Sequence, residues 1–396
     1  MMQISPEIQL FIREHSSDDV RVLALQAKKY PDIDMPTAIT QIAGRKVAAE
    51  KIPSWWEIEK IWYPKHLSLE QCSSEITARY KARLLQGDSL TDLTGGFGID
   101  CSFLATGFKP ATYVERQEEL CEIAAHNFPV LNLNHINIKN EDGVTYLQAM
   151  SPVDCLFLDP ARRNEHGGKT VAISDCEPNV AELEELLLQK ANRVMIKLSP
   201  MLDLSLALKE LKQTQEVHIL SVNNECKELL ILLGQTSPAE ISIHCVNLFT
   251  KGTQKEQHFV FTREQEQCSE CTYTDSLETY LYEPNASLLK AGAFRSIAAA
   301  YPVRKLHPNS HLYTSDTFIE NFPGRIFRIV NQCSFNKKEV KENLADLKKA
   351  NVTVRNFPAT VAELRKRIHL AEGGDTYLFA STLNNGQKVL IRCEKV

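Results

Sequence analysis

The sequence predicts an α/β protein built on a mostly parallel sheet, preceded by a helical region and followed by a separate α+β part. Three observations support this fold class. Short apolar runs alternate with helical segments between residues 87 and 236. The runs are apolar along their whole length, as is typical of strands covered on both faces. The chain has 396 residues, of which an ordinary 43% are hydrophobic. This length is more than a single hydrophobic core usually accommodates, so we expect several domains.

Residues 1–86 are predicted to be helical, because short apolar periodicities are broken by prolines. The segment SLEQCSSEITARYKARLL (68–85) is predicted to be one helix, since Ser68 and Gln71 have capping-box spacing. Four aromatic residues follow one another closely in this region: Trp55, Trp56, Trp62 and Tyr63. We interpret them as packing against the next domain, with an aromatic wall for a base as the alternative.

Residues 87–236 contain the predicted sheet. Its strands are SLTDLT (89–94), ATYVE (111–115), INIKNED (136–142), VDCLFLDP (153–160) and RVMIKLSP (193–200), followed by VHILSV (217–222) and ELLILLG (228–234). Helices are predicted after the second and fourth strands. In such a sheet, ligands bind at the carboxyl ends of the strands near the point where the strand order reverses.

The stretch DLTGGFGID (92–100) follows the first strand and leads into a helix. Gly95, Gly96 and Gly98 lack a β-carbon, so they permit a tight turn and a close ligand. The loop lacks the Gly-Lys-Ser/Thr ending of a phosphate-binding P-loop. It also departs from the dinucleotide fingerprint, because Cys101 stands where the third glycine or alanine belongs.

Three acidic residues stand at successive strand ends. Glu115 ends the second strand, where a carboxylate can accept hydrogen bonds from both hydroxyls of a ribose. Asp142 follows the third strand, where it can accept a bond from an adenine amino group. Asp159 begins the motif Asp-Pro-Ala-Arg at the end of the fourth strand, where chemistry on an acceptor would take place.

The glycine loop and these acids resemble the class I S-adenosylmethionine-dependent methyltransferases, whose sheet is Rossmann-like. The resemblance implies S-adenosyl-L-methionine as the cofactor and Asp159, Pro160 and Arg162 as catalytic residues. It implies the following cofactor-binding residues: Asp92, Thr94, Gly95, Gly96, Gly98, Asp100, Glu115, Arg116, Asp142, Gly143 and Asp159.

The chain departs from the family pattern in the Asp-Pro-Ala-Arg motif. Ala161 replaces a second proline, and Arg162 stands where methylases of base amines often have an aromatic that stacks on a flipped base. Arg162 and Arg163 are candidates for gripping a substrate phosphate, or are a surface pair. Cys176 resembles the nucleophile of carbon-methylating RNA enzymes, but it precedes the fifth strand, so carbon methylation is the second choice.

The last third of the chain changes pattern. A hairpin is predicted from AEISIHCVNLF and QHFVFT, and TYLYEPNASLLKAGAF reads as a strand leading into a helix. From residue 325 the predicted order is strand, helix, strand, helix, strand, strand, with a capping box at Thr360 and Glu363. We therefore expect an α+β connecting domain over 237–324 and a further module over 325–396.

Charge is distributed unevenly. The chain carries a formal net charge of -5, but residues 325–396 alone carry +7, so the remainder carries -12. This asymmetry indicates a polyanion-binding module attached to an acidic body, with an unliganded basic surface as the alternative. The residues expected to contact phosphates are Lys337, Lys338, Lys341, Arg365, Lys366 and Arg367.

Four stretches extend the resemblance to most of the chain: QCSSEITARYKA, DPARR, EPNASLLKAGAF and FPATVAELRKRIHLAEGGDTYLFAST. They resemble a bacterial family with a methyltransferase domain, a ferredoxin-like part and a THUMP-like domain. True THUMP domains accompany RNA-modifying enzymes, so the implied partner is RNA, either tRNA or rRNA. The alternatives are a methyltransferase acting on DNA, protein or a small molecule, and an inactive protein that binds cofactor and RNA. Three intact strand-end acids argue against inactivity.

Other features argue against a secreted or membrane protein. The eleven cysteines show no repeating spacing, which indicates reduced thiols in the cytoplasm. No signal peptide is recognisable, and no stretch approaches the roughly 20 apolar residues of a membrane span. CSEC (268–271) is a single C-x-x-C without a second pair, so no metal is predicted.

Overall fold

The computed structural model describes residues 4–162, 172–236 and 238–396. The chain divides into two compact units, each described here by itself. The first unit comprises Met1–Glu216 and Glu228–Pro238, and the second comprises Val217–Lys227 and Ala239–Val396. Among the described residues, no helix combines the length and the apolar character required to cross a membrane.

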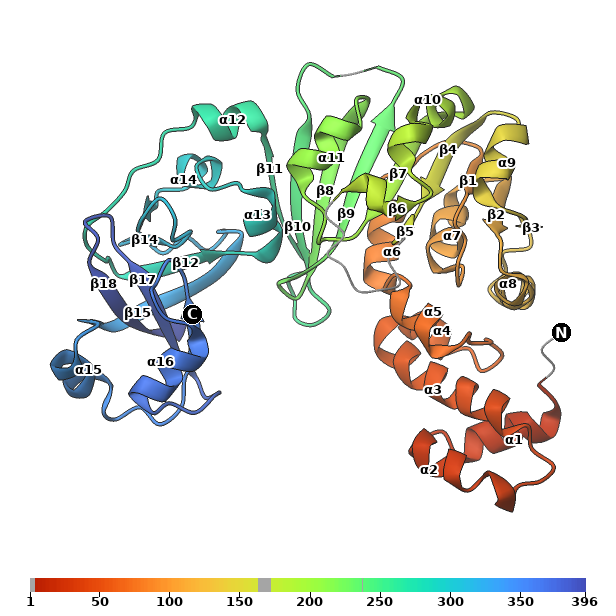
Figure 1. Cartoon of the computed structure of the whole chain (residues 1–396), viewed down its shortest axis with the longest axis horizontal. Helices are drawn as coiled ribbons and strands as arrows, with labels where there is room; N and C mark the ends of the chain where they lie inside the picture. Colours follow the sequence, from red (N-terminus) through yellow and green to blue (C-terminus); the bar gives the residue numbers. More distant parts are fainter. Residues whose placement is uncertain (1–3, 163–171, 237) are drawn as a thin grey trace. The chain divides into compact units, whose positions relative to one another are not determined.

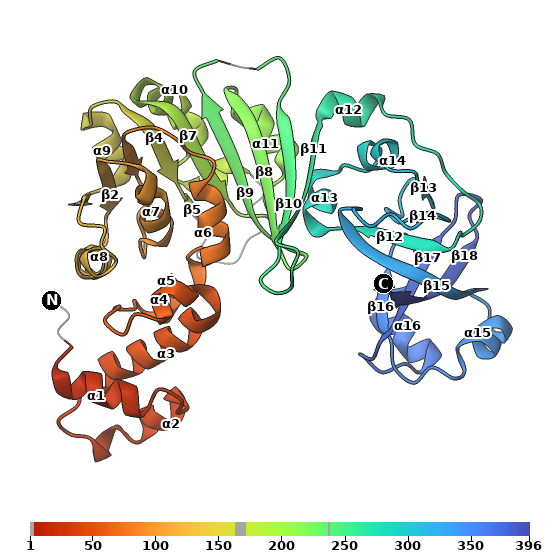
Figure 2. The same ribbon diagram turned by 180° about the vertical axis from the view of Figure 1, so that it is seen from behind.

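The first unit begins with short helices, drawn in red and orange in Figure 1: α1 (Pro6–Glu14), α2 (Val20–Leu25), α3 (Met35–Lys51), α4 (Pro53–Trp56), α5 (His66–Gln71) and α6 (Glu75–Ala82). Figures 1 and 2 both show α6 beside α7 (Ile99–Leu104) of the following domain. Three of the four predicted aromatic residues, Trp55, Trp62 and Tyr63, pack against that domain, whereas Trp56 is exposed. The Trp55 ring lies 5.2 Å from the Phe97 ring of the glycine loop, and Trp62 stacks on His126 at 3.8 Å.

The prediction of one helix from Ser68 onward is wrong. Two helices, α5 and α6, are separated by an extended turn at Cys72, and Ser68 lies inside α5 rather than at its N-cap. The reason is tertiary, because the next residue, Ser73, is buried and its hydroxyl donates a hydrogen bond to Asp100 of α7 while accepting one from Lys81 of α6. A continuous helix would not direct that hydroxyl to the same partners.

The sheet of the first unit follows the predicted strands closely. They are β1 (Leu90–Asp92), β2 (Ala111–Glu115), β3 (Ile136–Asn140), β4 (Val153–Leu158), β7 (Ala191–Leu198) and most of β9 (Glu225–Gly234). The predicted strand between β7 and β9, β8 (Thr214–Val222), belongs mainly to the second unit. The order is β3-β2-β1-β4-β7-β9, parallel from β3 to β7, with β9 antiparallel to β7. The accompanying helices are α7, α8 (Glu118–Val130), α9 (Gly143–Ala149), α10 (Val180–Lys190) and α11 (Leu204–Glu210). Two of these helices, α9 and α11, were not predicted.

The register of the parallel strands brings the predicted site residues to one edge. Asp92 at the end of β1 pairs with Tyr113 on one side and Phe157 on the other. Leu158, the last residue of β4, pairs with Ile196, so Asp159 leaves the sheet beside Lys197, which is still within β7. Because parallel strands end at the same edge, the loops after β1, β2 and β4 face a common space.

The second unit contains the predicted hairpin, β10 (Ser242–Leu248) and β11 (Glu256–Thr262), which follow β8 in the strand order and lead into α12 (Arg263–Cys268). A seven-stranded sheet follows in the order β13-β14-β12-β15-β18-β17-β16. Its strands are β12 (Tyr280–Pro284), β13 (Arg304–Lys305), β14 (Tyr313–Ser315), β15 (Gly324–Ser334), β16 (Asn351–Val354), β17 (Thr376–Thr382) and β18 (Lys388–Lys395). Its helices are α13 (Ala286–Ala291), α14 (Ser296–Ala300), α15 (Lys337–Leu344) and α16 (Val361–Ile368).

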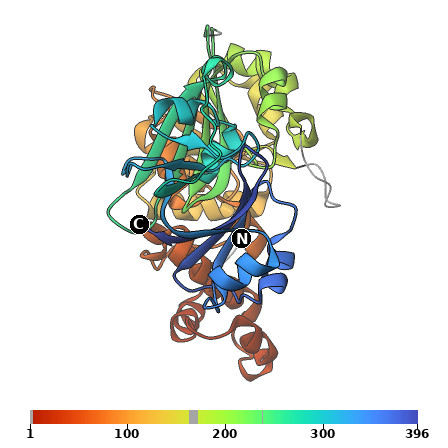
Figure 3. The same ribbon diagram turned by 90° about the vertical axis from the view of Figure 1, so that its left-hand side faces the viewer.

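Two apolar layers cover this sheet. Leu344 of α15 and Leu364 of α16 pack with Leu378 and Leu390 in one buried cluster, so both helices cover the same face. Figure 3 shows these two light-blue helices beside the dark-blue strands. Strand β15 pairs with both β12 and β18, so the sheet continues across residue 324. The proposed division at that residue, like the other domain boundaries, stays a prediction.

Candidate active site

The glycine loop after β1 is tightly packed at Gly95 and leaves room for an added atom at Gly96. Gly96 and Gly98 have φ angles of 54° and 87°, in the left-handed region that side chains rarely adopt. A β-carbon at Gly95 would lie 2.2 Å from the Tyr113 ring, so packing also excludes a side chain there. A β-carbon at Gly96 would meet no atom closer than 3.8 Å. The Gly96 backbone therefore leaves room for an atom that approaches it closely, as a bound ligand requires.

Glu115 is fixed against this loop. Its Oε2 accepts a hydrogen bond from the Gly96 amide at 2.9 Å, and its Oε1 accepts one from the Gln117 amide at 2.8 Å. The residue is only 8% exposed. An ionised carboxylate has about four lone-pair positions, so two remain for hydroxyl groups of a ligand.

Asp92 contributes a buried oxygen that the protein does not satisfy. Its Oδ1 accepts a bond from the Thr94 amide at 3.0 Å, whereas its Oδ2 has no hydrogen-bond partner among the described residues. Burial raises the pKa of Asp92 well above its usual range, and the nearby carboxylates of Asp100, Asp159 and Glu115 raise it further. A cation placed beside Oδ2 would offset both effects.

Asp142 and Gly143 shape the neighbouring loop after β3. Asp142 is exposed and caps α9, because its Oδ1 accepts bonds from the Val144 and Thr145 amides at 3.0 Å each. A β-carbon at Gly143 would lie 2.2 Å from the Leu93 carbonyl oxygen, so glycine lets α9 approach the end of β1. The sequence predicted this acid but not the helix it caps.

The Asp159 loop is tied to the glycine loop. The Asp159 amide donates a hydrogen bond to Thr94 Oγ1 at 2.6 Å, and the Asp159 side chain is 36% exposed while Pro160 is buried. After it comes β5 (Ala161–Arg162), which pairs with β6 (Cys176–Glu177) so that Arg162 faces Cys176 in the register. Thr94 thus joins the ends of β1 and β4.

Four other residues that the sequence singled out contribute less to the site. The predicted roles of Arg163 and of the Arg162 side chain lie outside the described residues. Arg116 is exposed and pairs with Glu177 at 3.2 Å. Cys176 lies closer to the Asp159 loop than its place in the sequence suggested, through the β5–β6 pairing, and it is buried.

Two lysines that the sequence analysis did not select lie beneath these acids. Lys197 follows Ile196 on β7 and forms an ion pair with Asp159. Lys81 of α6 is fully buried and lies 2.8 Å from Asp100 Oδ1 and 2.7 Å from Glu228 Oε2. Burial alone would lower the pKa of Lys197, but the carboxylates of Asp159, Asp100 and Glu228 outweigh it and raise this pKa. For Lys197, the sequence did contain a signal that could have identified it, because a lysine stands inside the apolar strand RVMIKLSP.

The site as a whole is acidic. Five carboxyl groups lie close enough to one another or to these two lysines to interact: Asp92, Asp100, Glu115, Asp159 and Glu228. The acids outnumber the lysines. An anionic pyrophosphate is disfavoured at such an edge, whereas a positively charged ligand is favoured.

The basic residues of the second unit lie on the two helices that share a face of its sheet. Lys337, Lys338 and Lys341 are exposed on α15, and Lys366 is exposed on α16. Two members of the predicted set are already engaged: Arg365 is half-buried and lies 3.4 Å from Glu372, and Arg367 lies over the Phe335 ring at 4.1 Å. The exposed lysines are therefore the better candidates for phosphate contacts.

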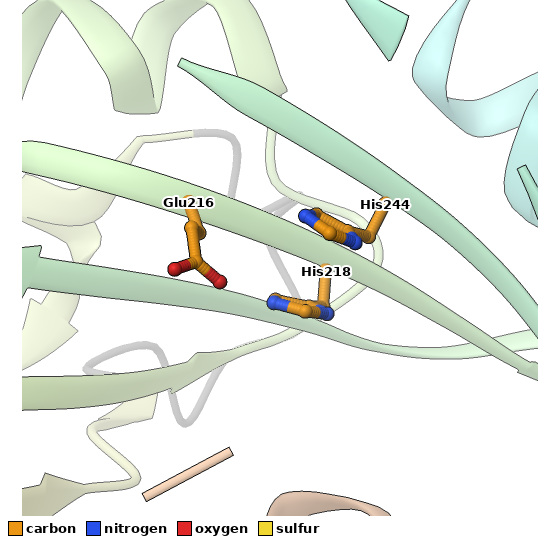
Figure 4. Close-up of side chains that lie close together, drawn as sticks. All are labelled: Glu216, His218 and His244. Atoms are coloured by element: carbon orange, nitrogen blue, oxygen red, sulfur yellow. The ribbon is translucent and has the colours of Figure 1, made fainter. Parts of the chain in front are cut away.

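A group of possible metal ligands lies elsewhere. Figure 4 shows Glu216 and His218 on β8 and His244 on β10. The two imidazoles stack with centroids 4.3 Å apart and planes 17° from parallel, and Arg193 pairs with Glu216 at 2.8 Å. Imidazole lone pairs lie in the ring plane, so stacked rings point them side by side rather than toward one ion. This arrangement is poor for a metal site.

Comparisons with known proteins agree with this architecture. A ferredoxin-like domain model matches residues 280–323, and a THUMP domain-like model matches 324–395. A structure described as a putative methyltransferase from Porphyromonas gingivalis W83 is 35% identical, covers 98% of each chain and superposes with a TM-score of 0.87.

Weaker likenesses carry no argument of their own. A putative methyltransferase from Streptococcus mutans in complex with SAH is 13% identical, with 40% of this chain and 96% of that chain covered and a TM-score of 0.30. An rRNA methylase from Streptococcus thermophilus is 14% identical, with 40% and 93% covered and a TM-score of 0.30. No curated protein matches the chain.

The likeness to the Porphyromonas gingivalis chain extends over both units and has the identity expected of relatives. The parallel sheet with its antiparallel β9, and the THUMP domain-like match at residues 324–395, bear out the resemblance found in the sequence. The chain belongs to the class I methyltransferase family that carries a C-terminal THUMP-like domain.

Proposed function

We propose that the protein transfers a methyl group from S-adenosylmethionine to a base in RNA, either tRNA or rRNA. The observation that carries this proposal is the acidic strand edge, with the buried, unsatisfied Asp92 Oδ2 beside a glycine loop open at Gly96. S-adenosylmethionine supplies an electrophilic methyl group on a positively charged sulfur. The net negative charge of the site favours this cation over NAD, whose pyrophosphate is anionic.

The chain's own residues divide the work of binding. Glu115 accepts the ribose hydroxyls, and Asp142, at the end of the neighbouring strand, accepts the adenine amino group. Gly96 lets the loop backbone approach, and Asp92 faces the charged end of the cofactor. Thr94, through its bond to the Asp159 amide, keeps the glycine loop and the acceptor loop in register.

Asp159 acts on the acceptor. In this proposal its carboxylate accepts a hydrogen bond from the acceptor nitrogen, and the Pro160 carbonyl fixes the orientation of that nitrogen. The lone pair must point in line with the bond being broken, so the gain comes mainly from positioning. Carbon methylation through Cys176 is the second candidate, favoured only by the β5–β6 pairing beside the acceptor loop.

RNA as the substrate is supported by the THUMP domain-like match and by the exposed lysines of α15 and α16. Such lysines bind phosphates without reading sequence, so they supply affinity and leave the choice of base to the Asp159 loop. We also place the protein in the cytoplasm, where these RNAs and reduced cysteines occur.

The test is transfer of radiolabelled methyl groups to separate total RNA, DNA and protein fractions. Wild type should label RNA, and Asp159→Asn should label it at least a hundredfold more slowly. Cys176→Ser is the matched variant on the adjacent strand β6 and should retain activity. Labelling of DNA or protein alone would remove the RNA assignment, and loss of activity in Cys176→Ser only would favour carbon methylation.

A further inference from the structure

A buried chain of charged side chains runs from the N-terminal helices to the acceptor loop. It begins at Lys81 on α6, whose ammonium group lies 2.8 Å from Asp100 Oδ1 and 2.7 Å from Glu228 Oε2. Lys81 also donates a hydrogen bond to Ser73 Oγ at 2.7 Å, and Ser73 donates one to Asp100 Oδ2 at the same distance. Every member is at least nine-tenths buried.

The same chain continues to the acceptor loop through Lys197. This residue is 8% exposed, and its ammonium group lies 3.8 Å from Asp100 Oδ2 and pairs with Asp159 Oδ2. Asp159 is the first exposed member, at 36% of its side-chain surface. The cations are therefore buried, and the chain reaches the surface only at the carboxylate placed at the acceptor.

Stability alone does not account for two lysines here. Buried ion pairs contribute little to stability, since the cost of removing both charges from water is comparable to their attraction. Leucine or methionine would fill the same space between apolar strands without that cost. The arrangement instead gives one carboxylate oxygen of Asp159 a fixed, positively charged partner.

We propose that Lys197 is a positioning residue that holds Asp159 Oδ2 and keeps Oδ1 for the acceptor. In the same proposal, Lys81 connects helix α6 of the N-terminal region to this ion pair. Lys81 fixes Asp100, the carboxylate shared with Lys197, so the methyltransferase sheet without α6 has an incomplete site. This proposal uses the proposed function only for its activity measurement.

The electrostatic consequence has a definite sign. Burial raises the pKa of Asp159, and Lys197 opposes that rise. Removing the Lys197 charge should therefore raise the pKa of Asp159. Because the ionised carboxylate is the active form, the acid limb of the pH–rate profile should move to higher pH. The other titratable groups around this pair are Asp92, Asp100, Glu228, Lys81 and Cys72.

The experiment uses the full-length chain with Lys197→Met, Lys197→Arg and Lys81→Met, and with Lys139→Met on exposed β3 as the control. Methyl transfer to total RNA is measured from pH 6 to 9. Lys197→Met should shift the acid limb upward by at least one pH unit and recover activity toward pH 9. Lys197→Arg, which retains the charge, should restore most of the shift. Lys81→Met should shift the limb in the same direction by less, and Lys139→Met should leave it in place.

A second measurement does not depend on catalysis. The carboxyl carbon of Asp159, identified by its loss in Asp159→Asn, is titrated by ¹³C NMR in each variant, and circular dichroism reports folding. An equal loss of activity at every pH with an unmoved Asp159 titration would overturn the proposal. Wild type that transfers no methyl group would refute the proposed function, while the NMR titration would still decide the role of Lys197. If Lys197→Met fails to fold, Lys197→Gln replaces it under the same criteria.

Discussion

Replacing Glu115 with glutamine tests whether this carboxylate organises the cofactor loop as well as binding the ribose. Both of its oxygens accept backbone hydrogen bonds, from Gly96 at 2.9 Å and from Gln117 at 2.8 Å. Glutamine has one acceptor oxygen and one amino group, so one of the two amides must face another donor. The substitution keeps the size and shape of the side chain. It removes one of the two hydrogen bonds to the carboxylate, and the remaining bond is made to a neutral acceptor instead of a charged one.

The expected cost follows from this geometry. One lost bond to a charged group amounts to about 1.5–3 kcal/mol. For a unit of this size, ~1 kcal/mol corresponds to about 2–4 °C, so the midpoint of thermal unfolding should fall by roughly 3–12 °C. The affinity for S-adenosylmethionine should fall at least tenfold, because the loop moves and the ribose loses an ionised acceptor.

The assay combines thermal denaturation of the ligand-free protein with titration calorimetry. Asp142→Asn is the matched control, since asparagine caps a helix as well as aspartate and should leave the unfolding midpoint unchanged. A Glu115→Gln protein with the midpoint and the affinity of wild type would refute the reasoning. A lower midpoint with unchanged affinity would keep the loop role and remove Glu115 from the ribose. Tight NAD binding by wild type would replace the cofactor assignment altogether.

Three further predictions concern the other parts of the site. Burial raises the pKa of Asp92 in the folded protein, so ionising this residue destabilises the fold as the pH rises above about 3.9, the pKa of an aspartate in the unfolded chain. Asp92→Asn should therefore raise the unfolding midpoint at pH 7.5, and this gain should vanish toward pH 4. The same variant should bind S-adenosylmethionine at least tenfold more weakly, and a lowered midpoint would contradict the buried-charge argument. Asp159→Asn should keep cofactor affinity within about threefold in calorimetry while turnover falls at least a hundredfold, because positioning of the acceptor is lost. Charge reversal at Lys338 and Lys366 should weaken RNA binding, measured by filter binding, and leave cofactor affinity unchanged. The slope of log affinity against log salt concentration should become shallower by about 0.7 per lost phosphate contact. An unaltered slope would mean that these lysines contact solvent and not RNA.

The structure also changes how the RNA-binding module should be tested. The sequence predicted a domain boundary after residue 324, which invites a truncation there, but β15 pairs with β12 on one side and β18 on the other. Cutting there would remove β15 and β18 from a continuous sheet and leave Leu281, Leu306 and Leu312 of its apolar cluster without their partners Phe327 and Phe379. Loss of RNA binding would then report unfolding, so charge reversals at exposed lysines are the better perturbation.

Local patterns were sufficient for much of the site. Gly96, Glu115 and Asp159 could be placed together from the sequence because each follows an apolar run, and parallel strands end at one edge of their sheet. The capping box at Thr360 and Glu363 is present in α16, with Thr360 Oγ1 accepting from the Glu363 amide at 3.2 Å. These features depend on residues only a few positions apart, which is the range over which sequence periodicity is informative.

The tertiary structure decided what depends on packing between distant segments. Lys81 and Glu228 are 147 residues apart, and no local pattern pairs them. The charge of Lys197 was visible in its strand, but only the register of β4 against β7 places it beside Asp159. The turn at Ser73 likewise follows from a buried hydroxyl bonding to Asp100 rather than from helix propensity. By itself the sequence therefore determined which strand ends carry the chemistry, because strand order and alternation are local. Only the folded chain determined which cations hold those carboxylates, because ion pairing depends on distance in space.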